Sequence, residues 1–164
     1  MLRLIPDLKK ERAMSHTDYI RKETLISMAI NGALSAAFFL LVFEWQSPVP
    51  LRGIGNWVFD FAPQSFMIAL MSVLVPGAIT KKRLGAGMVR PSGARTRLPR
   101  SLVLRALLFA VAAALIGTGL VAAIAALSGI AELGWGAAFV LKVVYGIVLA
   151  AIITPIGLRA ALAG

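Results

Sequence analysis

The chain has 164 residues with a net charge of +10; 59% of the residues are apolar, 15% are charged, and the mean hydropathy is +0.86. This composition is unusual for a soluble domain and typical of a membrane protein. The absence of cysteine excludes disulfides and thiol chemistry, and a single histidine, His16, excludes a multi-histidine metal or haem site within one chain.

The N-terminal residues 1–23 form a polar arm of mixed charge, which we expect to lie in the cytoplasm. The arm does not resemble a secretory signal peptide, because the apolar stretch behind it begins too late and runs too long. Met14 could replace Met1 as the native start, and this choice stays open. We therefore predict two parts, the arm over 1–23 and a transmembrane domain over 24–164.

Four apolar stretches predict an all-α integral membrane protein with four transmembrane helices. They cover about 24–44, 57–80, 101–128 and 135–157. About twenty helical residues cross the ~30 Å hydrocarbon core, so each stretch is long enough to span it. An even number of spans places both termini on one side, which we expect to be the cytoplasm.

The first span carries small, weakly polar residues at helical spacing: Thr24, Ser27, Asn31 and Ser35. Such a face favours close packing against another transmembrane helix, because small side chains allow approach and hydroxyls and amides bond across. Asn31 therefore has two interpretations, a hydrogen bond between helices or a contact to a substrate or ion. In the second span, Pro76 predicts a kink near the cytoplasmic end.

The connection between the second and third spans is strongly basic and contains no acidic residue. Its cations are Lys81, Lys82, Arg83, Arg90, Arg95, Arg97 and Arg100. Lysines and arginines in short loops are retained on the cytoplasmic side, so this loop predicts the topology. It also suits contact with anionic lipid headgroups. The alternative is a docking surface for an acidic cytoplasmic partner.

This topology accounts for the unusual charge. It places a net charge of +11 on the cytoplasmic side and −1 on the outer side. Since no aromatic interleaving or nucleic-acid-binding motif accompanies the cations, we expect no nucleic-acid partner.

Charged residues inside the last two spans are the candidates for chemistry. Arg105 lies one turn inside the third span, and we expect it to snorkel to the cytoplasmic headgroups. Lys142 lies ~10 Å inside the fourth span, where a charge is costly and is normally paired. Its possible partners are Asp60 and Glu44. Lys142 either forms a structural pair or snorkels outward, or it forms a coupling site for protons or ions.

A weak internal repeat relates the two halves of the chain. Trp57 precedes Pro76 by nineteen residues, and Trp135 precedes Pro155 by twenty. Two such hairpins would be related by an axis along the membrane normal. Duplication and the shared constraints of helical hairpins explain this pattern equally well.

The functional expectations follow from these features. No catalytic motif or phosphate-binding loop is present, so we expect neither an enzyme nor a bound cofactor or metal. The first hypothesis is a non-catalytic accessory or assembly subunit of a bacterial inner membrane, packing on itself or on another membrane protein. The alternative is a subunit of a homo-oligomeric small transporter or channel that uses Lys142 with Asp60 or Glu44.

Overall fold

The computed structural model describes residues 15–163. Residues 1–14 of the predicted arm, with the alternative start at Met14, and the last residue lie outside the described residues. The described chain contains four long helices: α2 (His16–Phe43), α3 (Phe61–Gly85), α4 (Leu102–Ser128) and α5 (Trp135–Leu162). Each of these four is long and apolar enough to cross a membrane, which confirms the predicted helical architecture of four candidate spans.

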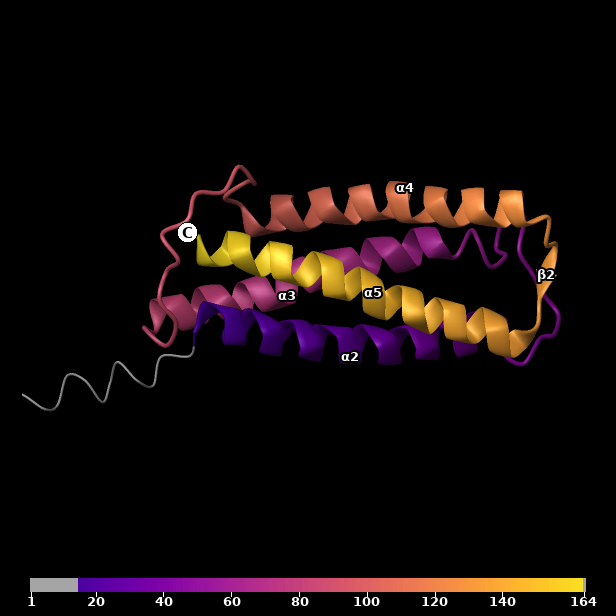
Figure 1. Cartoon of the computed structure of the whole chain (residues 1–164), viewed down its shortest axis with the longest axis horizontal. Helices are drawn as coiled ribbons and strands as arrows, with labels where there is room; N and C mark the ends of the chain where they lie inside the picture. The colour runs from indigo at the N-terminus through magenta and orange to yellow at the C-terminus, as the bar shows by residue number, and fades with distance from the viewer. Residues whose placement is uncertain (1–14, 164) are drawn as a thin grey trace, which may run out of the picture.

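The helices run side by side, as Figure 1 shows. The start of α2, the end of α5 and the α3–α4 loop lie together at one end of the bundle, which we name the basic end. The opposite end carries two short strands, β1 (Val49–Pro50) and β2 (Glu132–Leu133), and we name it the strand end.

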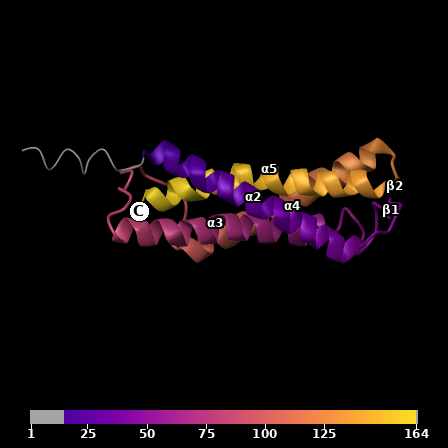
Figure 2. The same cartoon turned by 90° about the horizontal axis from the view of Figure 1, so that it is seen from below.

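The packing order of the helices differs from their order in the chain. The helix α2 packs mainly on α5, α4 packs mainly on α3, and α3 packs on α5 between them. Figure 2 gives the second view of this arrangement. The sequence neighbours α2 and α3 touch only weakly, and so do α4 and α5. Each hairpin thus places its first helix on the second helix of the other hairpin, an exchange that agrees with the repeat seen in the sequence.

Three helices, α2, α3 and α5, extend beyond the predicted spans at the basic end, whereas α3 begins at Phe61, four residues after the predicted start at 57. The helix α2 begins at His16, where the Ser15 hydroxyl accepts a hydrogen bond from the Asp18 amide at 3.1 Å. This N-cap and the acidic first turn stabilise the helix start, so residues 16–23 of the predicted polar arm form the first turns of α2. The helix α5 continues to Leu162.

The predicted basic loop is shorter than expected, because α3 continues to Gly85. Lys81, Lys82 and Arg83 therefore lie in the last turns of a helix. Cations are favourable there, since the carbonyl end of a helix carries partial negative charge. The chain leaves the helix just before Gly87, whose positive φ of 68° suits glycine. The helix also passes through Pro76 without ending.

The β1–β2 pair was not predicted. The strands are antiparallel, with Val49 opposite Leu133, and they join the two loops of the strand end. Two-residue strands show no periodicity that a sequence can reveal. The indole of Trp135 donates a hydrogen bond to the Glu44 carbonyl at 2.7 Å and holds the same loops together.

Small residues let the helices approach closely in the bundle interior. One such case is Gly146 of α5, where an added Cβ would collide with the Ser35 hydroxyl oxygen of α2. Buried apolar clusters lie around this contact, with Phe39 and Trp57 at the strand end, Val73 and Ala106 in the middle, and Leu158 at the basic end.

Candidate functional site

Polar side chains line the interior of the bundle from the basic end to the strand end. We name this set the polar seam. It comes from α2, α3, α5 and the turn before α3: Tyr19, Glu23, Ser27, Asn31, Ser35, Asp60, Gln64, Ser72, Thr80, Arg83, Lys142 and Thr154. Polar residues inside transmembrane helices either hydrogen-bond the helices to one another or line a pathway for an ion or substrate. The hydrogen bonds of each member indicate which of the two it does.

At the basic end, the seam begins with an ion pair between α2 and α3. Arg83 Nη1 lies 2.6 Å from Glu23 Oε1, and the guanidinium lies 5.4 Å from the centre of the Tyr19 ring. The Tyr19 hydroxyl lies 2.8 Å from the Thr80 hydroxyl. Arg83 was predicted as a loop cation, and it instead joins two helices.

In the middle of the seam, Asn31 is hydrogen-bonded within the protein. Its Nδ2 donates to the Ser27 carbonyl at 2.8 Å and to the Ser72 hydroxyl of α3 at 3.3 Å. The Thr154 hydroxyl of α5 donates to the Ser27 hydroxyl at 2.8 Å. Asn31 thus makes a hydrogen bond between helices, which is the first of the two interpretations given for it.

At the strand end, Lys142 is fully buried and paired. Its Nζ lies 2.5 Å from Asp60 Oδ2 and 4.0 Å from the centre of the Phe61 ring. The Lys142 side chain is 1% exposed, so it does not snorkel outward, and the Asp60 side chain is 21% exposed. Glu44 is exposed at the end of α2 and makes no ion pair within residues 15–163. Of the two predicted partners, the structure brings only Asp60 to Lys142.

Next to this pair, an open groove separates the weakly packed helices α2 and α3. We name it the α2/α3 groove; its volume is about 300 Å³ and its lining is mostly apolar. The polar members of its wall are Asn31, Ser35, Asp60 and Gln64. Sequence reasoning missed Gln64, because a lone glutamine near a helix start carries no signal of its own.

The side chain of Gln64 is only partly satisfied. Its Nε2 donates to the Ser35 hydroxyl at 3.0 Å and to the Lys142 carbonyl at 3.2 Å. Its Oε1 is buried and has no hydrogen-bond partner among the described residues. A buried acceptor without a donor costs about 1–3 kcal/mol, so a hydrogen bond to Gln64 Oε1 would stabilise the protein.

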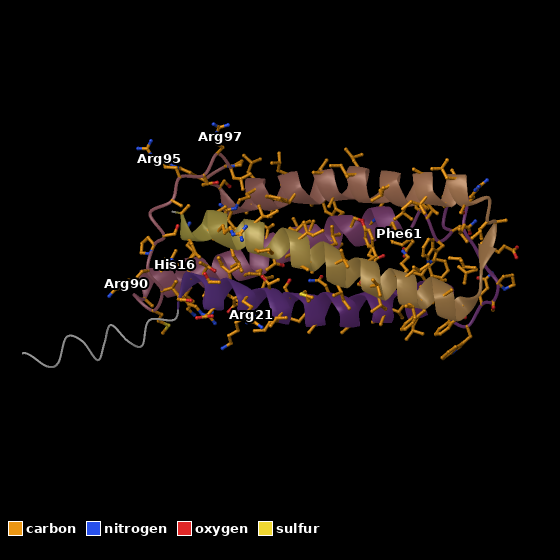
Figure 3. All side chains as sticks on the ribbon, in the orientation of Figure 1. His16, Arg21, Phe61, Arg90, Arg95 and Arg97 are labelled. Atoms are coloured by element: carbon orange, nitrogen blue, oxygen red, sulfur yellow. The ribbon has the colours of Figure 1, made fainter. Side chains whose placement is uncertain are left out.

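The rest of the predicted basic loop lies at the basic end, as the labelled side chains in Figure 3 show. Arg90, Arg95, Arg97 and Arg100 are exposed. The loop is tied to the helices, because Arg90 contributes its carbonyl to a 2.9 Å hydrogen bond with His16 Nε2.

Arg105 does not extend over the exposed surface of α4. Its side chain packs inward from α4, and the residue is 4% exposed. Its Nε has no hydrogen-bond partner in the part of the chain that the structure describes. Position one turn inside a span suggested an outward side chain, but the helix face, set by tertiary packing, directs it inward.

Within residues 15–163, no cluster of three or more histidines and carboxylates could hold a metal ion. Comparisons of the chain with protein-family models, with curated proteins and with solved structures found no match.

Proposed function

We propose that the protein is a non-catalytic accessory or assembly subunit of a bacterial inner membrane, which binds a transmembrane helix of another membrane protein in its α2/α3 groove. The basic end faces the cytoplasm in this proposal, because cationic loops and helix ends are retained there. The observation that carries the proposal is the groove itself, whose wall includes Gln64, a side chain with one acceptor left without a partner among the described residues.

The chemistry of the groove favours a helix over a lipid chain. An acyl chain would fill the apolar part and leave Gln64 Oε1 without a donor. A partner helix that carries serine, threonine, asparagine or glutamine supplies the donor, and such bonds are common between transmembrane helices. The rim also suits a protein surface, since Met67 and Met71 are exposed and their flexible side chains adapt to a partner.

The interior of the bundle supports a structural role for the rest of the polar seam. Asn31 and Lys142 both have partners within the protein, and Arg83 pairs with Glu23. Polar groups that bond one another hold helices together and leave little chemistry to perform on a substrate. The groove is therefore the part of the molecule that we assign to binding.

Site-specific photo-crosslinking in the native membrane tests the proposal. A photoreactive amino acid replaces Met67 in the groove, which is 44% exposed, or Leu115 on the lipid-facing side of α4, which is 71% exposed. We expect one discrete protein adduct from position 67 and none from position 115. Filling the groove by a second substitution, Met71→Trp, should abolish that adduct while the protein remains folded. Equal labelling at both positions, or only lipid adducts at 67, would refute the proposal.

The buried ion pair favours a second candidate, a subunit of a homo-oligomeric transporter or channel. Lys142 and Asp60 lie inside the predicted span region, where ionisable residues often mark ion or proton pathways. Four helices enclose little space, so this function requires an oligomer. Purified protein in liposomes should then show a flux that Lys142→Met abolishes without lowering the folded yield. Loss of flux and folded yield together would assign the pair to structure.

A further inference from the structure

A cavity at the basic end brings two cations together with Arg105, whose buried Nε has no hydrogen-bond partner among the described residues. The cavity has a volume of about 440 Å³ and lies where α3, α4 and α5 converge. Its cations are Lys81 from α3, Arg100 from the loop and Arg105 from α4. No acidic residue of the described chain lines it.

The state of Arg105 is the observation that points to a ligand. The residue is 96% buried and faces this cavity, yet its Nε has no hydrogen-bond partner in residues 15–163. Burying an arginine without a counter-charge is costly, and the two other basic residues in the same cavity increase the repulsion. The two ion pairs among the described residues use Glu23 and Asp60, so neither acid neutralises Arg105.

From these contacts we infer that the cavity binds the phosphate of an anionic phospholipid. Arginine is suited to a phosphodiester, because its planar fork donates two parallel hydrogen bonds to phosphate oxygens. The cavity also lies at the N-terminus of the long helix α4, where the helix dipole favours an anion. The site is distinct from the α2/α3 groove and does not depend on what that groove binds.

A lipid fits this position better than a free phosphate. The first turns of α4 beyond the cavity carry exposed apolar side chains, among them Leu104 and Leu108. Acyl chains attached to a headgroup in the cavity can follow this surface. Basic pockets between transmembrane helices are a known way to hold anionic lipid headgroups.

Native mass spectrometry of the detergent-solubilised protein, titrated with phosphatidylglycerol, tests the inference. We expect a first lipid whose affinity falls by about tenfold to a hundredfold in Arg105→Gln, because a charge-assisted hydrogen bond is lost. The matched control Arg97→Gln removes an exposed cation of the same loop that does not line the cavity. It should change the affinity by less than about twofold, because a distant exposed charge is screened.

A second variant separates the cavity from the charge. Ala161→Trp fills the cavity and leaves all three cations in place, so it should lower phosphatidylglycerol affinity as strongly as Arg105→Gln. If Arg105→Gln fails to fold, as judged by far-ultraviolet circular dichroism, Ala161→Trp decides the matter. Equal loss in Arg97→Gln, or no loss in Ala161→Trp, would show diffuse attraction and overturn the site.

The source of the phosphate is decided by two further titrations. Phosphatidylcholine, which has no net charge, should bind without regard to Arg105. Inorganic phosphate should fail to displace phosphatidylglycerol. If phosphatidylcholine competes equally, the site does not recognise anionic lipid, and if inorganic phosphate displaces the lipid, the site belongs to a free anion; either result overturns the assignment.

Discussion

The Lys142–Asp60 ion pair allows a quantitative test of how the strand end of the bundle is held together. The two charged atoms lie 2.5 Å apart, and the two side chains differ in exposure, 1% for Lys142 and 21% for Asp60. The perturbation is a double-mutant cycle with Lys142→Met, Asp60→Asn and both together. The measured quantity is the free energy of unfolding.

The exposures predict unequal single-mutant costs. Asp60→Asn leaves a fully buried ammonium without a counter-ion, which should cost about 3–5 kcal/mol. Lys142→Met leaves a carboxylate that retains partial access to solvent or headgroups, so we expect a smaller cost of about 1–3 kcal/mol. The double variant buries no charge and should lie within about 1 kcal/mol of the wild type. The coupling between the two positions should therefore exceed about 2 kcal/mol.

Unfolding by sodium dodecyl sulfate in mixed micelles, followed by circular dichroism, supplies these free energies. The matched control is the cycle at Arg83 and Glu23, where the arginine side chain is 38% exposed. Solvent reaches the arginine but hardly the glutamate, whose side chain is 8% exposed, so the coupling there should be smaller than at Lys142–Asp60. A coupling at Lys142–Asp60 no larger than at this control would refute the reasoning.

The double variant also separates the two functional candidates. Because it should fold, any loss of activity in it reflects chemistry rather than stability. Because Asp60 also lines the α2/α3 groove, the partner is tested with Lys142→Met alone, and an accessory subunit should keep its crosslinked partner in that variant. A transporter that uses the ammonium and carboxylate should lose flux completely.

Further predictions concern packing, topology and the start of α2. Gly146→Ala should destabilise the bundle by about 1–3 kcal/mol through overpacking, whereas Gly119→Ala, where a Cβ meets open space, should be neutral or slightly stabilising. Thermal unfolding in detergent measures both variants. Equal effects would contradict the close approach of α5 to α2 at Gly146. Because the chain lacks cysteine, the single substitutions Arg95→Cys and Ile54→Cys report its topology in the membrane. A maleimide that cannot cross the membrane should label position 54 from the outside and position 95 only after permeabilisation. The reverse result would invert the proposed orientation. Ser15→Ala removes the N-cap and should increase amide hydrogen exchange in the first turn of α2, at a cost of about 1 kcal/mol; unchanged exchange there would show that the cap does not matter.

The number and type of the long helices followed from hydropathy alone. Every peptide group in a bilayer must be hydrogen-bonded within its own segment, so a long apolar stretch has one structural solution. The small polar face of the first span also predicted a packing face, and Ser27, Asn31 and Ser35 do face other helices. Spacing at 3.6 residues per turn is a local property, and it survives whatever the partner helix is.

Helix ends were predicted less well, because they depend on capping and on neighbours. The start at His16 rests on the Ser15 cap, and α3 continues to Gly85 beyond the apolar stretch that predicted it. A hydropathy window follows the membrane boundary, whereas a helix ends where its backbone loses partners. The two boundaries need not agree.

Only the tertiary structure decided which charged residues meet. Lys142 had two candidate partners in the sequence, and the exchange of helices between hairpins, which places α5 against both α2 and α3, selects Asp60. The same exchange leaves α2 and α3 apart and so opens the groove beside Gln64. The packing of α4 on α3 also places the side chain of Arg105 in a cavity at the basic end. Hydropathy determines which segments enter the membrane, because the free energy of transfer is a sum over the residues of one segment. Which helix faces meet depends instead on packing between segments far apart in the chain, so it cannot be read from the residues of one segment.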